Sequence, residues 1–392
     1  MNYKLLRYKL IFERVLISPF VIAGKMYAYM FPLKTKHDIV LFFSNADIGG
    51  GPQVNIDVTE CIKDHHSPLI IFSKKPKNNQ FIERFKLKGV RVIDLYQWID
   101  NKSYHFVNCF FRGVIACWIK QQKIPVVLGG ECLYFYKIIP HIPKEVRRVE
   151  ICHLDTWMNY SVGFIRFISL RVFSTDYLKR IIEQQYTNHS IPSDYAKQLK
   201  FIENCIDISP LKEVENEILQ VYFIGRGAPQ KRVHLVAAIA KKVHELQLPV
   251  KFNFVGDVEN IVKKEEYPYC QFYGNVNEER TMQKIYKEAD VLLMTSLYEG
   301  LPMVIMQMMA HGKTIVSTAV NSIPDYIRDM ENGLLIHSED ENDIIEEGSR
   351  HIITLLNNKV LRNDMGKRNH ALALEKFSRT TFCKSYQQIL FQ

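Results

Sequence analysis

The segment VYFIGRGAPQKR, residues 221–232, combines two patterns that occur together in one kind of structural unit. Its first four residues are apolar without alternation, which is typical of a strand buried on both faces of a parallel sheet. Two glycines then indicate a turn, and residues 233–246 place apolar side chains on one face of a helix. The segment therefore predicts a strand, a glycine-containing loop and a helix, the repeating unit of α/β proteins.

Similar short apolar runs occur on both sides of this segment, each followed by a stretch with helical spacing. The pattern starts twice, before and after a charged stretch near residues 208–220. It predicts an α/β protein of two doubly wound, Rossmann-like domains, with a ligand site in the cleft that they face. The expected strands are 39–43, 69–72, 90–93 and 126–128 in the first domain, and 221–224, 252–255, 291–294 and 314–316 in the second.

The length and composition agree with this division. The chain has 392 residues, enough for two domains of ordinary size, and its 47% hydrophobic and 24% charged residues are those of a globular protein. Eight cysteines without a CxxC pair favour neither a zinc ribbon nor a disulfide framework. A reducing, cytoplasmic environment is therefore expected.

The net charge of +9 is concentrated at one end of the chain. Residues 1–37 contain seven lysines and arginines and one acidic residue, so six of the nine charges lie there. Because the remainder is nearly balanced, a basic nucleic-acid-binding surface spread over the fold is not expected. The distribution favours a local patch that faces an anionic partner.

The same N-terminal segment is rich in apolar and aromatic residues, but its uninterrupted run, residues 15–24, is too short to span a bilayer. We therefore expect a basic amphipathic segment that contacts an anionic membrane surface. Two alternatives stay open, an ordinary helix packed on the first domain and a cleaved signal peptide ending near residue 23. The expected limits are 1–37 for this segment, 38–210 and 211–378 for the domains, and 379–392 for a C-terminal helix that returns toward the first domain.

The loop after residue 224 has the features of a phosphate-binding site. Its glycines permit close approach of an anion to the backbone, and the following helix start supplies free N–H groups. Arg226 and Lys231 add two positive charges. A solvated basic loop is the alternative.

A second motif, SLYEGLPMVIMQMMAHG, occupies residues 296–312. Pro302 suits the first turn of a helix and Gly312 its end, so Glu299 lies just before the helix and Gln307 inside it. A carboxylate beside free helix N–H groups can hold sugar hydroxyls while the amides meet anionic oxygens. The alternative role for Glu299 is that of an N-terminal capping residue.

With these motifs, residues 39–390 resemble the retaining nucleotide-sugar glycosyltransferases of glycosyltransferase family 4, which have the GT-B fold. The resemblance is strongest over 221–337. It implies that Arg226 and Lys231 bind the donor diphosphate, that Glu299 binds the donor sugar, and that the amides of Gly300 and Leu301 lie near both. Residues 201–207 and 323–325 are also similar to segments of the family. So are residues 272–276, which include Val276, and in the family the corresponding segment lies beside the nucleobase.

One position departs from the family pattern. Where the family commonly has a second glutamate that holds the ribose hydroxyls, this sequence has Gln307. An amide still offers an acceptor and two donors, so ribose binding is retained without the charge-assisted hydrogen bond. The departure places donor affinity or nucleotide preference in question.

The first domain carries three further candidate segments. The loop NADIGGGPQ, residues 45–53, resembles the family's glycine loop near the donor phosphates and the acceptor, through Gly50 and Gly51, although three glycines also make plain turns. His153, in the segment 149–157, follows an expected strand where the family often places a histidine near the reacting sugar; a hydrogen-bonded core histidine is the alternative. Residues 129–131 are candidates for acceptor binding.

No metal or cofactor is expected. There is no Asp-x-Asp motif at a strand end, and the acidic run at 339–343 is typical of a solvated helix start. Arg226, Lys231 and helix amides would then neutralise the phosphate charge, so that activity is metal-independent.

These observations predict a hexosyl- or related glycosyltransferase of the EC 2.4 type that moves a sugar from a nucleoside diphosphate sugar to a hydroxyl acceptor. The acceptor is expected to be a lipid-linked glycan or polysaccharide of bacterial surface synthesis, such as lipopolysaccharide or capsule. The enzyme would be cytoplasmic or peripheral on the inner membrane, and nucleic acid is not expected as a partner. A catalytically silent glycan-binding or scaffold module and a nucleotide-sugar epimerase of the same fold are the alternatives.

Overall fold

A computed structural model describes residues 3–101, 104–154, 157–211 and 215–392. Residues 155–156 of the histidine segment and 212–214 of the expected linker lie outside these ranges. The chain forms two compact units. One contains the residues up to 204 together with 380–392, and the other contains 205–379.

The first unit is built on a seven-stranded sheet in which every strand pair is parallel. The side chains of β1, β2 and β4 are buried along their whole length, which explains why their sequences are apolar without alternation. The strand order is β3-β2-β1-β4-β5-β6-β7. The strands are β1 Ile39–Phe43, β2 Pro68–Phe72, β3 Arg91–Asp94, β4 Val126–Gly129, β5 Arg147–Cys152, β6 Leu170–Phe173 and β7 Leu199–Phe201.

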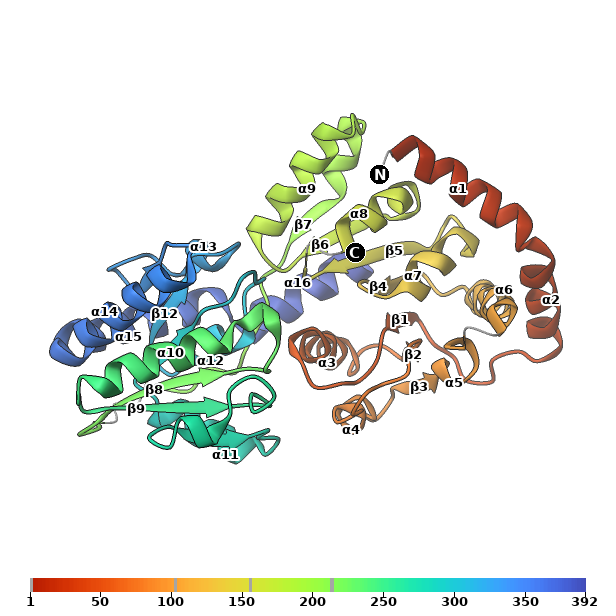
Figure 1. The fold of residues 1–392 in the computed structure, drawn as a ribbon. Coiled ribbons are helices and arrows are strands. Elements are labelled where there is room, and N and C mark those ends of the chain that lie inside the picture. The colour runs from red at the N-terminus through yellow and green to blue at the C-terminus, as the bar shows by residue number, and fades with distance from the viewer. Residues whose placement is uncertain (1–2, 102–103, 155–156, 212–214) are drawn as a thin grey trace. The chain divides into compact units, whose positions relative to one another are not determined.

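Helices of very different lengths connect these strands (Figure 1). The two N-terminal helices, α1 Tyr3–Leu16 and α2 Ser18–Met30, precede the first strand, and α2 packs along α6 His105–Gln121. Residues 3–16 and 18–30 of the segment 1–37 are therefore helical, and α2 packs on the first domain. The other helices are α3 Gly50–Ile62, α4 Ile82–Phe85, α5 Tyr96–Ile99, α7 Leu133–Ile138, α8 Met158–Ser161 and α9 Asp176–Asn188.

Within the described ranges, we find no helix with the length and apolar character needed to cross a membrane.

The second unit is a six-stranded parallel sheet of order β10-β9-β8-β11-β12-β13. Successive residues of β8 enter different cores, with Val221 in one hydrophobic cluster and Tyr222 in the other, so the sheet is covered on both faces. The strands are β8 Leu219–Ile224, β9 Val250–Val255, β10 Gln271–Gly274, β11 Val291–Met294, β12 Thr314–Thr318 and β13 Gly333–Ile336. The helices are α10 Val233–Glu245, α11 Glu279–Glu288, α12 Met303–Ala310, α13 Ile323–Tyr326, α14 Glu341–Asn357 and α15 Lys359–Lys376.

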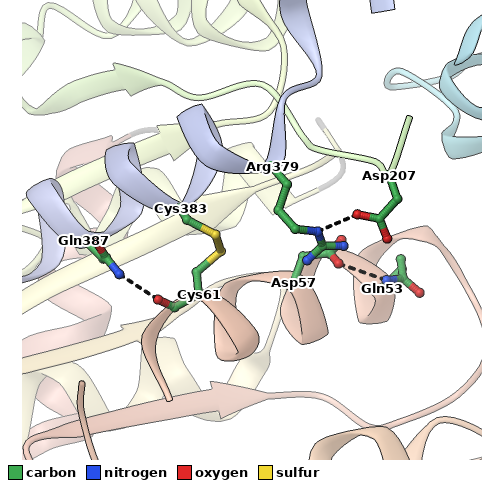
Figure 2. Close-up of a disulfide and its surroundings, with 7 residues drawn as sticks. All are labelled: Gln53, Asp57, Cys61, Asp207, Arg379, Cys383 and Gln387. Carbon is green, nitrogen blue, oxygen red and sulfur yellow. Dashed lines mark hydrogen bonds and ion pairs between the residues drawn. A yellow bond between two sulfur atoms is a disulfide. The ribbon is translucent and has the colours of Figure 1, made fainter. Parts of the chain in front are cut away.

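The last helix, α16 Arg379–Phe391, packs on the first unit and is joined to it by a disulfide bond (Figure 2). Cys383 is bonded to Cys61 near the end of α3, and Gln387 Nε2 donates to the carbonyl of Cys61 at 2.8 Å. The cysteine spacing did not indicate this bond, because the two residues are 322 positions apart and only the fold brings them together. Cys109, Cys117, Cys132, Cys152 and Cys270 are free thiols.

Candidate active site

Two loops of the second unit meet because β8 and β11 are neighbouring parallel strands whose carboxyl ends lie at one edge. The loop after β8 contains residues 225–232, and the loop after β11 contains residues 295–302. The amide of Leu297 donates to the carbonyl of Gln230 at 2.8 Å, and Gln230 Nε2 donates to the carbonyl of Tyr298 at 2.7 Å. The two motifs predicted from the sequence therefore form one site.

The central contact of this site is an ion pair between Lys231 and Glu299. Their side chains are only 14% and 7% exposed, so the pair is largely shielded from water. The amide of Glu299 donates to Asn321 Oδ1 at 3.0 Å, which fixes the backbone beside it. The N-cap of α12 is Pro302, and within the described part of the chain Glu299 makes no capping hydrogen bond to this helix.

Arg226 and Arg232 have opposite environments on the same loop. Arg226 is exposed and has no side-chain partner among the described residues. Arg232, which the sequence analysis did not single out, is buried, has a positive φ of 44° and donates to the carbonyls of Thr295 at 2.7 Å and Ser296 at 3.2 Å. Arg232 therefore holds the two loops together, while Arg226 is available to an anionic ligand.

Glycine is required at one position of this loop. A β-carbon on Gly227 would lie 2.2 Å from Asn260 Oδ1 and 2.4 Å from the carbonyl of Asp257, closer than any side chain permits. The amide of Gly227 donates to that carbonyl at 2.6 Å. The loop thus packs directly against the segment after β9, which fixes the position of Arg226 next to it.

Three polar side-chain atoms near α12 are buried without a hydrogen-bond partner in the described structure. They are Oε1 of Gln307, in α12, and the hydroxyls of Ser296 and Ser322. A buried polar atom left unpaired costs about 1–3 kcal/mol, so it is usually retained for a ligand or a water. The two serines were missed from the sequence because single serines at strand and helix ends carry no distinct pattern.

We predict that Gln307→Glu keeps or raises donor affinity. The change restores a carboxylate in the same volume, and a carboxylate makes a stronger, charge-assisted hydrogen bond to a ribose hydroxyl than an amide does. The dissociation constant of the nucleotide that binds the wild type measures this. A much weaker affinity in the variant would show that Gln307 does not face a ribose.

The other predicted residues of the second unit are Val276, Gly300, Leu301 and the acidic run. Val276 follows β10, is half-buried and packs on the core that contains α12. Gly300 and Leu301 are buried just before α12. In the acidic run, Asp340 accepts from the amides of Asn342 and Asp343 and caps α14, as expected for a helix start.

In the first unit, the three predicted segments surround one cavity of about 140 Å³ at the carboxyl ends of β1, β4 and β5. A β-carbon on Gly51 would lie 4.0 Å from Cδ2 of His153, so the glycine loop lies against the imidazole. Helix α3 begins at Gly50, so the last four residues of the predicted loop 45–53 form the first turn of this helix. The cavity is lined by Phe43, Ser44, Asn45, Gly51, Pro52, Asn55, Gly129, Gly130, Glu131, Ile151 and His153.

The imidazole of His153 is enclosed but makes no hydrogen bond within the described ranges, since both ring nitrogens are buried and unpaired. Among the described residues, the ring therefore lacks the hydrogen bonds expected of a hydrogen-bonded core histidine. Burial lowers its pKa to about 4, so the ring is neutral at physiological pH. A neutral imidazole offers one donor and one acceptor, which suits a sugar hydroxyl.

Glu131 has a supporting position next to this histidine. Its Oε1 accepts from the amides of His153 and Leu154, both at 2.6 Å. The carboxylate therefore fixes the backbone that carries the imidazole. The sequence indicated residues 129–131 as candidates for acceptor binding. It did not indicate these hydrogen bonds, because they join the ends of two different strands.

The pKa of His153 predicts an acid-sensitive stability. Because the folded-state pKa, about 4, lies below the unfolded value of 6.5, the unfolded chain binds more protons between these pH values. The free energy of unfolding should therefore fall by about 3 kcal/mol for this group as the pH drops from above 6.5 to 4. Urea unfolding of the wild type and of His153→Gln at pH 7.5 and 4.5 measures the difference. Parallel pH dependences in the two proteins would contradict the assignment.

Among the described residues, no group of three or more His, Cys, Asp or Glu side chains is arranged to hold a metal ion.

Two parallel sheets, each covered by helices and each carrying polar loops at its carboxyl edge, define the GT-B fold of glycosyltransferases. The solved structure of Anabaena HepE in complex with UDP and glucose is similar to this chain with a TM-score of 0.68. That similarity covers 90% of this chain and 99% of HepE at 16% sequence identity. The fold predicted from the sequence is therefore confirmed.

Residues 219–358, which lie in the second unit, match the family model described as Glycosyl transferases group 1. An uncharacterized 41.2 kDa protein in the cps region of Klebsiella pneumoniae is 27% identical over 332 residues, 81% of this chain and 86% of that protein. The poly(ribitol-phosphate) alpha-N-acetylglucosaminyltransferase of Staphylococcus aureus is 28% identical over 193 residues, 45% of this chain and 37% of that enzyme. Similar proteins therefore include glycosyltransferases of bacterial surface glycan synthesis.

Proposed function

We propose that this protein is a retaining glycosyltransferase of family 4 that transfers a sugar from a nucleoside diphosphate sugar to a hydroxyl acceptor. The observation that carries the proposal is the Lys231–Glu299 pair, which joins the loops after β8 and β11 inside the segment that matches the glycosyltransferase model. A cation and a carboxylate side by side suit a phosphate and a sugar that are covalently linked. The similarity to HepE, whose structure was solved in complex with UDP and glucose, supports a donor of this class.

In the second unit, each candidate residue has a role in holding the donor. Arg226 and Lys231 neutralise the diphosphate, and Glu299 accepts from hydroxyls of the donor sugar. The amides of Gly300 and Leu301 meet the sugar and the phosphate. Gln307 Oε1, buried and unpaired, accepts from a ribose hydroxyl, while Val276 borders the base.

In the first unit, the glycine loop and His153 serve the reacting sugar and the acceptor. Gly51 lines the cavity and lets the backbone approach a ligand there, with Gly50 next to it, and the unpaired ring nitrogens of His153 bind a hydroxyl in the same cavity. Since its pKa is about 4, His153 acts as a neutral hydrogen-bonding group and not as a cation.

The chemical step proceeds on one face of the donor sugar. The bond between the anomeric carbon and the phosphate oxygen breaks, and the acceptor oxygen bonds to the same carbon from the same side. The leaving phosphate takes the proton of the acceptor hydroxyl. Arg226 and Lys231 stabilise the developing negative charge, a contribution of about 2.7–4 kcal/mol for each preorganised donor in comparable sites.

The acceptor that this proposal assigns is a lipid-linked glycan or polysaccharide of the bacterial surface. The names of the similar proteins from Klebsiella pneumoniae and Staphylococcus aureus support this class. The proposal places the enzyme in the cytoplasm, peripherally on the inner membrane, where lipid-linked acceptors are exposed.

We predict that transfer continues in excess EDTA. Two cations on the loop after β8 can meet the diphosphate charge without a bridging metal ion. Initial rates with and without the chelator measure this. Complete loss of activity, restored by Mn²⁺ or Mg²⁺, would show that a metal site takes part.

The proposed reaction is tested by incubating the protein with UDP-, GDP-, ADP- and CMP-sugars and a short oligosaccharide acceptor. Nucleotide release is followed with time, and proton NMR gives the anomeric configuration of the product. We expect one nucleotide class to be consumed and the configuration to be retained. An inverted product would contradict the retaining mechanism. Tight donor binding without any release would instead favour the silent glycan-binding module, for which Gln307 is the motivating residue.

A further inference from the structure

The two N-terminal helices expose large apolar side chains on the surface of the first unit. Tyr8 is 71% exposed and Met30 is 68% exposed, and several large apolar side chains between them are also exposed. We call this surface the α1–α2 face. Its exposed apolar residues are Tyr8, Ile11, Phe12, Val15, Leu16, Phe20, Ile22, Met26, Tyr27, Tyr29, Met30 and Phe31.

The inward side of α1 carries a charge where a helix of a water-soluble domain normally carries apolar residues. Glu13 points into the domain, where Arg112 Nη1 donates to its carboxylate at 3.2 Å and Lys137 Nζ at 2.5 Å. Arg112 is itself only 2% exposed. Helix α1 thus has Leu10 and an ion pair on its inner side, while phenylalanine, leucine and valine side chains are exposed on its outer side. This largely reverses the usual amphipathic arrangement.

Helix α2 also has an unusual distribution of side chains, with small residues on its inner side and large ones on its outer side. Its inward residues include Gly24 and Ala28, which are buried, and its large residues point outward. A β-carbon on Gly24 would lie 2.0 Å from the carbonyl of Phe110, and one on Gly113 would lie 2.0 Å from the carbonyl of Val21. The backbones of α2 and α6 therefore touch, and this contact leaves no room for large side chains except on the outer side.

The apolar surface continues beyond the N-terminal segment. The rings of Phe20 and Phe106 have centroids 6.0 Å apart, and Tyr104 packs edge-on against Phe106 at 6.0 Å. Tyr104, Phe106 and Trp98 are 56%, 49% and 62% exposed. Tyrosine and tryptophan are the side chains that favour the boundary between lipid and water.

The exposed charges of residues 7–36 all have one sign. Between residues 7 and 36, the exposed charged side chains are Arg7, Lys9, Arg14, Lys25, Lys34 and Lys36. The single acidic residue of that range, Glu13, is used in the internal ion pair. The complementary partner is therefore both apolar and anionic.

We propose that the α1–α2 face, together with Trp98, Tyr104 and Phe106, docks on an anionic lipid bilayer. The helices lie in the plane of the interface, with their apolar side chains in the acyl boundary and their basic residues at the lipid phosphates. A second copy of this chain is a poorer occupant, because a symmetric contact would bring the same positive charges together. The proposal stands apart from the catalytic assignment, although it would place the enzyme beside lipid-linked acceptors.

The structure also determines which variants test this surface. Deleting residues 1–37 would remove the partner of Arg112 and Lys137 and expose the α6 backbone, so loss of binding would not be distinguishable from unfolding. We therefore choose exposed side chains only. The docking variant is Phe12→Ser/Leu16→Ser/Met26→Ser, and the matched control, on the second unit, is Leu246→Ser/Val360→Ser/Leu374→Ser, whose parent side chains are also more than half exposed.

Co-sedimentation with vesicles of phosphatidylglycerol and phosphatidylethanolamine measures the binding, with phosphatidylcholine vesicles as the neutral comparison. We expect the wild type and the control to bind the anionic vesicles, and the docking variant to bind at least tenfold more weakly with an unchanged melting temperature. Arg7→Gln/Lys9→Gln/Lys25→Gln should lose about a hundredfold, and the wild type should be partly released by high salt.

Three results would overturn the proposal. The first is equal vesicle binding by the docking variant and the wild type, and the second is no binding of the wild type to anionic vesicles. The third is that the wild type elutes as a dimer in size-exclusion chromatography while the docking variant elutes as a monomer. The last result would assign the surface to a second copy. Turnover with a soluble acceptor and donor is measured in parallel, and its failure in the wild type would count against the proposed function without affecting the binding result.

Discussion

Arg226→Ala should lower turnover at least a hundredfold while leaving the melting temperature unchanged. Arg226 is exposed and has no side-chain partner among the described residues, so its removal costs the folded state little. Its position is fixed by the packing of Gly227 against the segment after β9, which directs a full positive charge to the place proposed for the diphosphate. Loss of one such preorganised group typically costs a factor of about 10²–10³ in turnover.

The matched control for this prediction is Arg350→Ala, which removes an exposed arginine from α14 of the same unit. Steady-state rates and thermal melts of both variants are compared with those of the wild type. Normal kinetics in Arg226→Ala would remove the diphosphate assignment. A similar loss in the control would show that net charge, and not this position, is responsible.

A second large effect is expected at the Lys231–Glu299 pair. Lys231→Met and Glu299→Gln should each reduce turnover at least a hundredfold, because the donor loses either a phosphate partner or a sugar partner. The pair is 14% and 7% exposed, so Lys231→Met also leaves a shielded carboxylate unpaired. Breaking a buried pair costs about 3–5 kcal/mol of stability, and less for a partly exposed one.

The double variant Lys231→Met/Glu299→Gln separates structure from catalysis. It leaves no unpaired charge, so the free energy of unfolding should recover most of the loss seen in Lys231→Met, while turnover stays as low as in the worse single variant. Denaturant unfolding and initial rates measure the two quantities. If turnover recovered together with stability, the pair would be structural and our assignment of both residues would be wrong.

The sequence predicted the two sheets because strands buried on both faces are apolar throughout, as in β1, β2 and β4. It also placed Lys231 in the loop after a strand and Glu299 just before a helix. It could not show that these residues touch, since they are 68 positions apart and their contact depends on β8 and β11 being neighbours. Strand order is set by the packing of the whole domain and not by any local pattern.

Residues that support the sites were missed for a related reason. Arg232 was quoted as part of a basic loop, but its buried hydrogen bonds to the loop after β11 distinguish it from Arg226 only in three dimensions. Glu131 braces His153 through backbone amides of a neighbouring strand end, and Cys61 meets Cys383 across 322 positions. These contacts join distant segments, so neither spacing nor composition indicates them.

Two interpretations of the N-terminal segment do not exclude each other. Packing on the first domain and contact with a membrane were separate interpretations of the sequence. The structure shows the packing, through Gly24 and Gly113, and this same contact directs the large apolar side chains outward. The overall apolar and basic composition of a helix does not show which of its faces packs on the domain.

The proposal that the loops after β8 and β11 bind a nucleoside diphosphate is tested most directly by calorimetric titration. Each of UDP, GDP, ADP and CDP is titrated into the wild type and into Arg226→Ala. We predict that one of them binds the wild type, that the matching monophosphate binds at least tenfold more weakly, and that Arg226→Ala removes the difference between the two. Absence of binding by every nucleotide, or equal binding of the diphosphate by the variant and the wild type, would contradict the account.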